Sequence, residues 1–336
     1  MTIQPPAKRY LWIWFLWLGI FYVSWFSLIH FTSAWQTTAE HWPMAVAMAL
    51  GSYAAGSTPM GGGTVGFPVL VLLFDLPASL GRDFSFAVQS IGMVSASIFI
   101  LVRRQPVAWP ILKGATLGAL FGTPLGIFFI APEVPDLWIK VIFAIIWGSF
   151  GLLHLYRINE ISTNTGMTEF DEKWDHKLGF ILGLGASALA VSVTGVGIDM
   201  VIYAALVLLC RADLKIAIPT SVIIMAFASV YGVVIKSVTN SWQPGVYENW
   251  LAAAPVVALG APLGVFVVEF INRKYTLLIV ATLCVGQLLW TFQNEYDALG
   301  VGGIALAVIA VGLCLLVFEK LRDWGAKLTS ENPTKL

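Results

Sequence analysis

The feature that most constrains this chain is a series of long apolar runs. A helix needs about 20 apolar residues to cross the hydrocarbon core of a bilayer, which is about 30 Å thick. Eight runs approach or exceed that length: Tyr10–Phe31, Phe84–Val102, Trp109–Ile130, Leu137–Tyr156, Ile216–Ile235, Tyr247–Ile271, Thr276–Phe292 and Leu299–Phe318. The pattern predicts an all-α polytopic membrane protein, because helices satisfy their own backbone polar groups in lipid.

The composition excludes the main alternatives. Only 11% of the 336 residues are charged, whereas about 25% is usual in soluble domains, so a soluble enzyme would lack the polar residues to cover its surface. The 19 Lys and Arg residues are balanced by 19 Asp and Glu, and no basic stripe is present to bind phosphates. The sequence therefore predicts a lipid bilayer, and no nucleic acid, as a partner.

Four further apolar runs are shorter: Pro43–Ser57, Thr64–Phe74, Leu178–Val193 and Ile198–Leu209. They form two pairs, and each pair is joined by a glycine-rich tip without charge. Runs of this length are typical of re-entrant segments. The sequence predicts eight full spans plus two hairpins, or up to twelve spans if the short runs cross.

Basic residues are distributed unequally between the predicted loops. With the N-terminus inside, 15 of the 19 Lys and Arg residues lie on the inner side, and only Arg82 and Lys236 fall on outer loops. Cytoplasmic loops carry an excess of Lys and Arg. This bias predicts a multi-pass protein of the plasma membrane (the inner membrane in a bacterium), with both termini cytoplasmic.

The two halves of the chain resemble each other. The segment Gly122–Phe128 recurs as Gly260–Phe266, 138 residues later, and the tip Met60–Gly63 recurs as Thr194–Gly197. We also pair Gln89-Ser90 with Thr220-Ser221. Each unit reads as a hairpin and three helices, and an odd number of crossings places the second unit upside down. The sequence thus predicts two inverted repeats.

These repeats define the predicted domains. They are an N-terminal transmembrane helix (1–42), a first inverted repeat (43–157), a cytoplasmic linker (158–177), a second inverted repeat (178–294) and a C-terminal transmembrane helix with its tail (295–336).

The two tips are the predicted binding site. Inverted repeats with broken helices at the midplane are the architecture of secondary transporters. A helix begins after each tip, at Thr64 and at Ile198, and its first N–H groups favour an anion. The predicted substrate is a small anion. The predicted transport mechanism is alternating access at the two tips. The alternative is that the glycines only allow close helix packing.

These motifs resemble the TauE/SafE sulfite exporter family over residues 43–320. The likeness rests on Gly61-Gly62-Gly63, Pro68, Gln89-Ser90, Thr220-Ser221 and Ala261–Gly264. The resemblance implies transport of sulfite, thiosulfate or organosulfonates. The chain departs from the family pattern in two ways: the second tip, Gly195-Val196-Gly197-Ile198-Asp199, lacks the usual third glycine, and Ile202 stands where the second proline would be. The departures bear on the substrate rather than on the fold.

Polar residues near the tips are the candidate ligands. The predicted substrate-binding residues are Ser57, Thr58, Gly61, Gly62, Gly63, Thr64, Gln89, Ser90, Thr194, Gly195, Gly197, Thr220 and Ser221. Asp199 is the one acid placed deep in the membrane, and we predict that it couples transport to a proton, since a bound anion favours the protonated form. The alternatives are that the hydroxyls bond their own helices and that Asp199 caps a helix.

No enzyme motif is present in the sequence. It contains no HExxH, P-loop, GxSxG or paired-cysteine pattern, so we predict no enzyme activity, no cofactor and no metal site. The remaining alternatives are an uptake carrier for a carboxylate or another small anion, and a membrane scaffold or sensor that transports nothing. No feature of the sequence predicts an oligomeric state.

Overall fold

The protein folds into helices joined by short loops. The computed structural model describes residues 10–168, 170–268, 270 and 273–331, and none of these residues lies in a strand. The first half contains α1 (Leu11–Phe31), α2 (Trp35–Glu40), α3 (Trp42–Ser57), α4 (Gly63–Pro68), α5 (Ala78–Val102), α6 (Trp109–Leu125) and α7 (Asp136–Ile161). The second half contains α8 (Glu172–Ala186), α9 (Ser192–Thr194), α10 (Ile198–Ala204), α11 (Leu214–Val238), α12 (Val246–Val267), α13 (Arg273–Asn294) and α14 (Tyr296–Glu331).

Four five-residue π-helical segments continue these helices. They are η2 (Val69–Leu73) after α4, η3 (Gly126–Ile130) after α6, η5 (Ser187–Val191) between α8 and α9, and η6 (Ala205–Leu209) after α10. A single 3-10 turn, η4 (Ala131–Glu133), follows η3. With these segments, the two arms that follow the tips become Gly63–Leu73 and Ile198–Leu209, which are too short to be ordinary spans.

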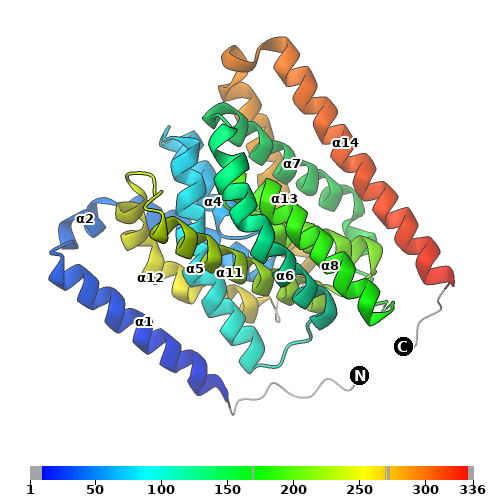
Figure 1. Ribbon diagram of the computed structural model, residues 1–336, viewed down its shortest axis with the longest axis horizontal. Helices are drawn as coiled ribbons and strands as arrows, with labels where there is room; N and C mark the ends of the chain where they lie inside the picture. The colour runs from blue at the N-terminus through cyan, green and yellow to red at the C-terminus, as the bar shows by residue number, and fades with distance from the viewer. Residues whose placement is uncertain (1–9, 169, 269, 271–272, 332–336) are drawn as a thin grey trace.

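Among the described residues, nine helical stretches are long and apolar enough to cross a bilayer. Eight correspond to the predicted spans, and the ninth is Glu172–Thr194. This stretch includes the apolar run Leu178–Val193, which we predicted as a short hairpin arm, and is longer because the helix begins within the charged linker. α1 and α14 lie along opposite edges of the bundle (Figure 1), where few of their side chains are buried.

Two charges lie in the bundle rather than in outer loops. Arg82 is in α5 and Lys236 is in α11, and both residues are buried. The prediction that they fall on outer loops was wrong, because Asp83, which is fully buried, pairs with both cations. Partnered charges can be buried, so α5 begins at Ala78, six residues before the predicted start of its apolar run.

Several local features recur at a separation of 136 residues. α5 and α11 each contain 25 residues, and Leu214 follows Ala78 by that interval. Asp75 and Arg211, also 136 residues apart, both have a left-handed backbone. The helices therefore align Ser85 with Ser221, whereas the motif pairing above aligned Gln89 with Thr220.

The first arm of each hairpin packs on a helix from the other half. α3 lies against α12, and α8 lies against α6. Glycines allow these backbones to approach closely: a Cβ atom at Gly56 would overlap the carbonyl of Ala261, and one at Gly122 would overlap the carbonyl of Leu184. Such contacts between small residues are common between membrane helices. They hold each tip against the opposite half.

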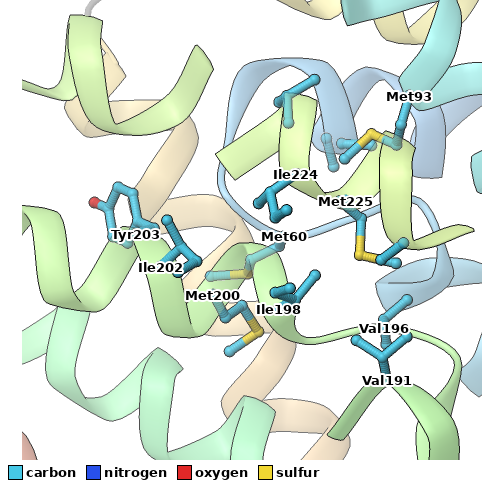
Figure 2. Packing of buried hydrophobic residues seen from close by; sticks show 14 of the residues in the cluster. Met60, Met93, Val191, Val196, Ile198, Met200, Ile202, Tyr203, Ile224 and Met225 are labelled. Carbon is cyan, nitrogen blue, oxygen red and sulfur yellow. The ribbon is translucent and has the colours of Figure 1, made fainter. Parts of the chain in front are cut away.

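An apolar core surrounds the tips. Phe67, Phe143 and Trp147 form a stack with ring centroids 4.1 Å apart at each step. Figure 2 shows part of the same cluster, in which Met60 of the first tip and Ile198 after the second are labelled with their apolar neighbours. The tips are thus enclosed by protein, where irregular backbone is tolerated at membrane depth.

Candidate functional site

The first tip connects α3 to α4. α3 ends at Ser57, and Thr58 adopts an extended backbone (φ −136°, ψ 167°). The Thr58 hydroxyl donates to the carbonyl of Ala54 (2.7 Å) and accepts a hydrogen bond from the Met60 N–H (3.3 Å). The N–H groups of Gly62 and Gly63 have no hydrogen-bond partner among the described residues. The chain therefore presents free amide donors where α4 begins.

The second tip connects α9 to α10 through two left-handed glycines. Gly195 has φ 80° and Gly197 has φ 118°, which is a region that residues with a Cβ atom rarely adopt. The Thr194 hydroxyl lies 2.9 Å from the carbonyl of Ala190 and 3.0 Å from that of Val196, and its one proton is shared between these two acceptors of its own hairpin. This turn directs the start of α10 toward the first tip.

Asp199 joins the two tips. Its Oδ2 accepts a hydrogen bond of 2.8 Å from the N–H of Gly61, 138 residues earlier in the chain. Its Oδ1 accepts from the N–H groups of Gly197 (3.2 Å) and Met200 (3.0 Å). The side chain is fully buried. The carboxylate therefore takes up amide donors from both hairpins, which are groups that would also suit an incoming oxyanion.

Gln89 of α5 lies between the same two tips. Its Nε2 donates to the carbonyls of Gly195 and Ser85, each at 3.2 Å. Its Oε1 is buried and has no hydrogen-bond partner among the described residues. A Cβ atom at Gly61 would overlap this oxygen, so the carboxamide rests against the first tip. A buried carboxamide oxygen without a partner is unusual in a folded protein. It accepts and does not donate, so it can bond only a group that carries an N–H or O–H.

The family comparison covers this part of the chain. The family model for the sulfite exporter TauE/SafE matches residues 44–290, a region that includes both tips, Gln89 and Asp199. The chain belongs to the TauE/SafE sulfite exporter family. No curated protein and no solved structure matches it. The membership agrees with a polytopic membrane transporter, since the same region carries most of the apolar spans.

In this TauE/SafE chain, the residues predicted for the site differ in how closely the structure brings them to the two tips. Hydrogen bonds or close approach bring together Gly61, Gly63, Gln89, Gly195, Gly197 and Asp199. Gly62 lies beside the side chain of Met48. Thr58, Thr64 and Thr194 are in or next to the tips, but their hydroxyls already have protein partners.

Four other predicted residues point elsewhere. Ser57 donates to the carbonyl of Tyr53 (2.7 Å) and Ser221 to that of Ile218 (2.8 Å), within their own helices. Thr220 donates to its own helix and accepts from the N–H of Ala108, where α6 approaches. Ser90 donates to the carbonyl of Ala87 and lines a separate cavity beside α12. All four hydroxyls donate to carbonyls of their own helices, which was the alternative to substrate binding.

Two residues at the site were missed from the sequence. Ser85 lies against both tips, because a Cβ atom at Gly63 or at Gly195 would press on its side chain. Trp147 donates from Nε1 to the Thr64 hydroxyl at 2.7 Å. The offset of 136 residues between α5 and α11 is the signal that pairs Ser85 with Ser221. Trp147 carried no such signal, since it is one of 14 tryptophans in apolar surroundings.

Proposed function

We propose that this chain is a secondary transporter of small anions that carries sulfite, thiosulfate or organosulfonates by alternating access at its two tips. Membership of the sulfite exporter family supports the substrate class. The observation that carries the proposal is the bridge from Gly61 to Asp199, because one buried carboxylate accepts amide donors from both hairpins. A site that already holds an oxyanionic group in this way has the donors that a sulfur oxyanion needs.

Asp199 has the coupling role in this proposal. A substrate anion that binds beside an ionised carboxylate is repelled by it, so binding is favoured when a proton neutralises the side chain. The proton and the anion then cross together. The fully buried position of Asp199 supports this role, since an ionisable side chain at membrane depth is a functional candidate by default.

The repeats supply the movement. The second unit is inverted relative to the first, and the crossed packing of α3 on α12 and of α8 on α6 supports this arrangement. Rocking of one unit against the other then opens the tips to each side in turn. We further propose that both termini are cytoplasmic, as the loop charges indicate, so that the charged contacts of Arg157 with Glu319 lie on the cytoplasmic side.

A substrate panel in proteoliposomes tests the function. Vesicles that contain the purified protein should take up sulfite, thiosulfate, sulfoacetate or taurine faster than protein-free vesicles do, and should take up acetate no faster than protein-free vesicles do. Preference for acetate would support a carboxylate carrier instead. A folded protein that moves none of these compounds would support a scaffold or a sensor.

A further inference from the structure

A cavity of about 550 Å³ lies between α5, η3, α7 and α11, and no residue of either tip lines it. Its wall includes Arg82, Lys236 and Asp136, together with Ser192, which is two residues before the second tip begins at Thr194. Its wall includes Asp136, where α7 begins at the predicted outer side, and it is called the outer cavity below. Its volume is within the range of small-molecule sites, about 300–1,000 Å³.

Asp83 is the shared partner of both cations in this wall. The Nζ of Lys236 lies 2.9 Å and 3.0 Å from the two carboxylate oxygens of Asp83, and 3.1 Å from the carbonyl of Ser241. The N–H of Gln243 donates to the same carboxylate at 3.1 Å. The three donors of Lys236 therefore have protein acceptors at hand.

Arg82 is bonded differently. Its Nε donates to Oδ1 of Asp83 at 2.9 Å. Its two Nη groups donate to no described residue, although the side chain is only 9% exposed. A guanidinium has five N–H donors in a fixed fork that suits an oxyanion. Arg82 thus presents charged donors to the open cavity, and the described residues supply an acceptor only for its Nε.

The other acid in the wall is already held by the protein. Asp136 accepts hydrogen bonds from the N–H groups of Ala78 (3.1 Å) and Ser79 (3.2 Å), at the first turn of α5. A carboxylate is stabilised at that helix end. Arg82, Lys236 and Asp83 together have a net positive charge, which the Asp136 carboxylate balances across the cavity wall. What favours an anion here is therefore the set of Arg82 donors without acceptors.

We propose that the outer cavity is a separate oxyanion-binding site, in which the Nη groups of Arg82 hold a sulfite, thiosulfate or sulfonate group before or after its passage between the tips. The role in passage rests on the proposed function. The position supports it, because a Cβ atom at Gly195 of the second tip would overlap the backbone carbonyl of Arg82. Ile127, Phe128 and Ile139 line the same cavity and offer apolar contacts to the organic part of a sulfonate.

Thermal unfolding of the purified full-length protein tests the site directly. A ligand that binds the folded state raises its unfolding temperature, so thiosulfate and methanesulfonate should each raise it in a saturable way, relative to chloride at equal ionic strength. Arg82→Gln should require about 10- to 100-fold more anion, which is the effect expected on losing charge-assisted hydrogen bonds. The anion concentration that Arg82→Lys requires should lie between those of the wild type and Arg82→Gln, since lysine keeps the charge and loses the forked set of donors.

Lys113→Gln is the matched control, because Lys113 is an exposed cation of α6 that does not line the cavity. Its anion response should equal that of the wild type. An equal response in Arg82→Gln, or no response in the wild type, would overturn the proposal. The rise in unfolding temperature is compared between thiosulfate and methanesulfonate. An inorganic oxyanion needs only the guanidinium, whereas a sulfonate also contacts the apolar wall.

Labelling supplies a test that keeps Arg82 in place. Ser79→Cys puts a thiol in the cavity wall, and thiosulfate should slow its reaction with a membrane-impermeant reagent added from outside; unchanged labelling would also overturn the proposal. The two proposals fail separately. If anion binding depends on Arg82 but the protein shows no flux, the transport function is contradicted and the outer cavity site is supported. If the protein shows flux but anion binding does not depend on Arg82, the site is contradicted and the transport function is supported.

Discussion

The N–H of Gly61 donates a hydrogen bond of 2.8 Å to the carboxylate of Asp199, across 138 residues of sequence. This bond joins the glycine tip of the first half to the start of a helix in the second half. It cannot persist while an oxyanion uses the same N–H, so substrate binding and the contact between the tips compete. A transporter needs such a link between binding and movement.

Asp199→Asn should remove the pH dependence of flux. Asparagine is neutral at every pH, so it mimics the protonated acid and keeps anion binding, but it cannot carry a proton with the substrate. Its carboxamide oxygen can still accept from Gly197 and Met200, while its NH₂ group would face the N–H of Gly61. We therefore expect flux that does not vary with pH and does not accumulate substrate against a gradient, measured with proteoliposomes over a pH series.

Asp213→Asn is the control for that variant, because Asp213 caps α11 by accepting from the N–H of Lys215 (2.8 Å) at an exposed position. Its flux should follow the pH profile of the wild type. An unchanged profile in well-expressed Asp199→Asn protein would show that Asp199 only caps a helix.

Gln89→Leu should abolish most flux with little effect on folding. Leucine is of similar size, but it removes both the bond to Gly195 and the carboxamide oxygen next to Gly61. The neighbouring change Ser90→Ala should leave flux unchanged, because that hydroxyl is bonded to its own helix. Initial rates of thiosulfate uptake at matched protein levels compare the two variants, and equal rates would remove Gln89 from the site.

Thr64→Val should destabilise the fold. Valine has nearly the shape of threonine but cannot accept the hydrogen bond of 2.7 Å from the Trp147 indole. A buried donor left without a partner costs about 1–3 kcal/mol. Thr116→Val is the control, since that hydroxyl donates only to Leu112 of its own helix. Unfolding in detergent should show a lower midpoint for Thr64→Val alone, and equal midpoints would contradict this account of the indole contact.

The sequence predicted the features that depend on local hydrophobicity. Apolar runs specify helices in lipid, so the helical class and the eight long spans follow from them. Glycine clusters break helices, so both tips were also found. The family was recognised from the same glycines, and the family comparison confirms it.

Features that depend on contacts across the fold were not predicted. Arg82 and Lys236 resemble loop residues in sequence, and only the position of Asp83 between them explains their burial. Ser90 and Thr220 are polar and close in sequence to the site, yet helix rotation turns their hydroxyls toward other partners. Ser85 was missed for the converse reason, since it reaches both tips only through tertiary packing.

Trapped-substrate counterflow tests the central claim most directly. Vesicles loaded with unlabelled thiosulfate, with labelled thiosulfate outside and no ion gradient, should accumulate label transiently when they contain the wild-type protein. Gly61→Ala should lose this exchange, because its Cβ atom would displace the Gln89 carboxamide, whereas Gly62→Ala should keep it, since the nearest atom is a flexible Met48 methyl group at 3.2 Å. Absence of counterflow in the wild type, or equal exchange in Gly61→Ala, would contradict anion passage between the two tips.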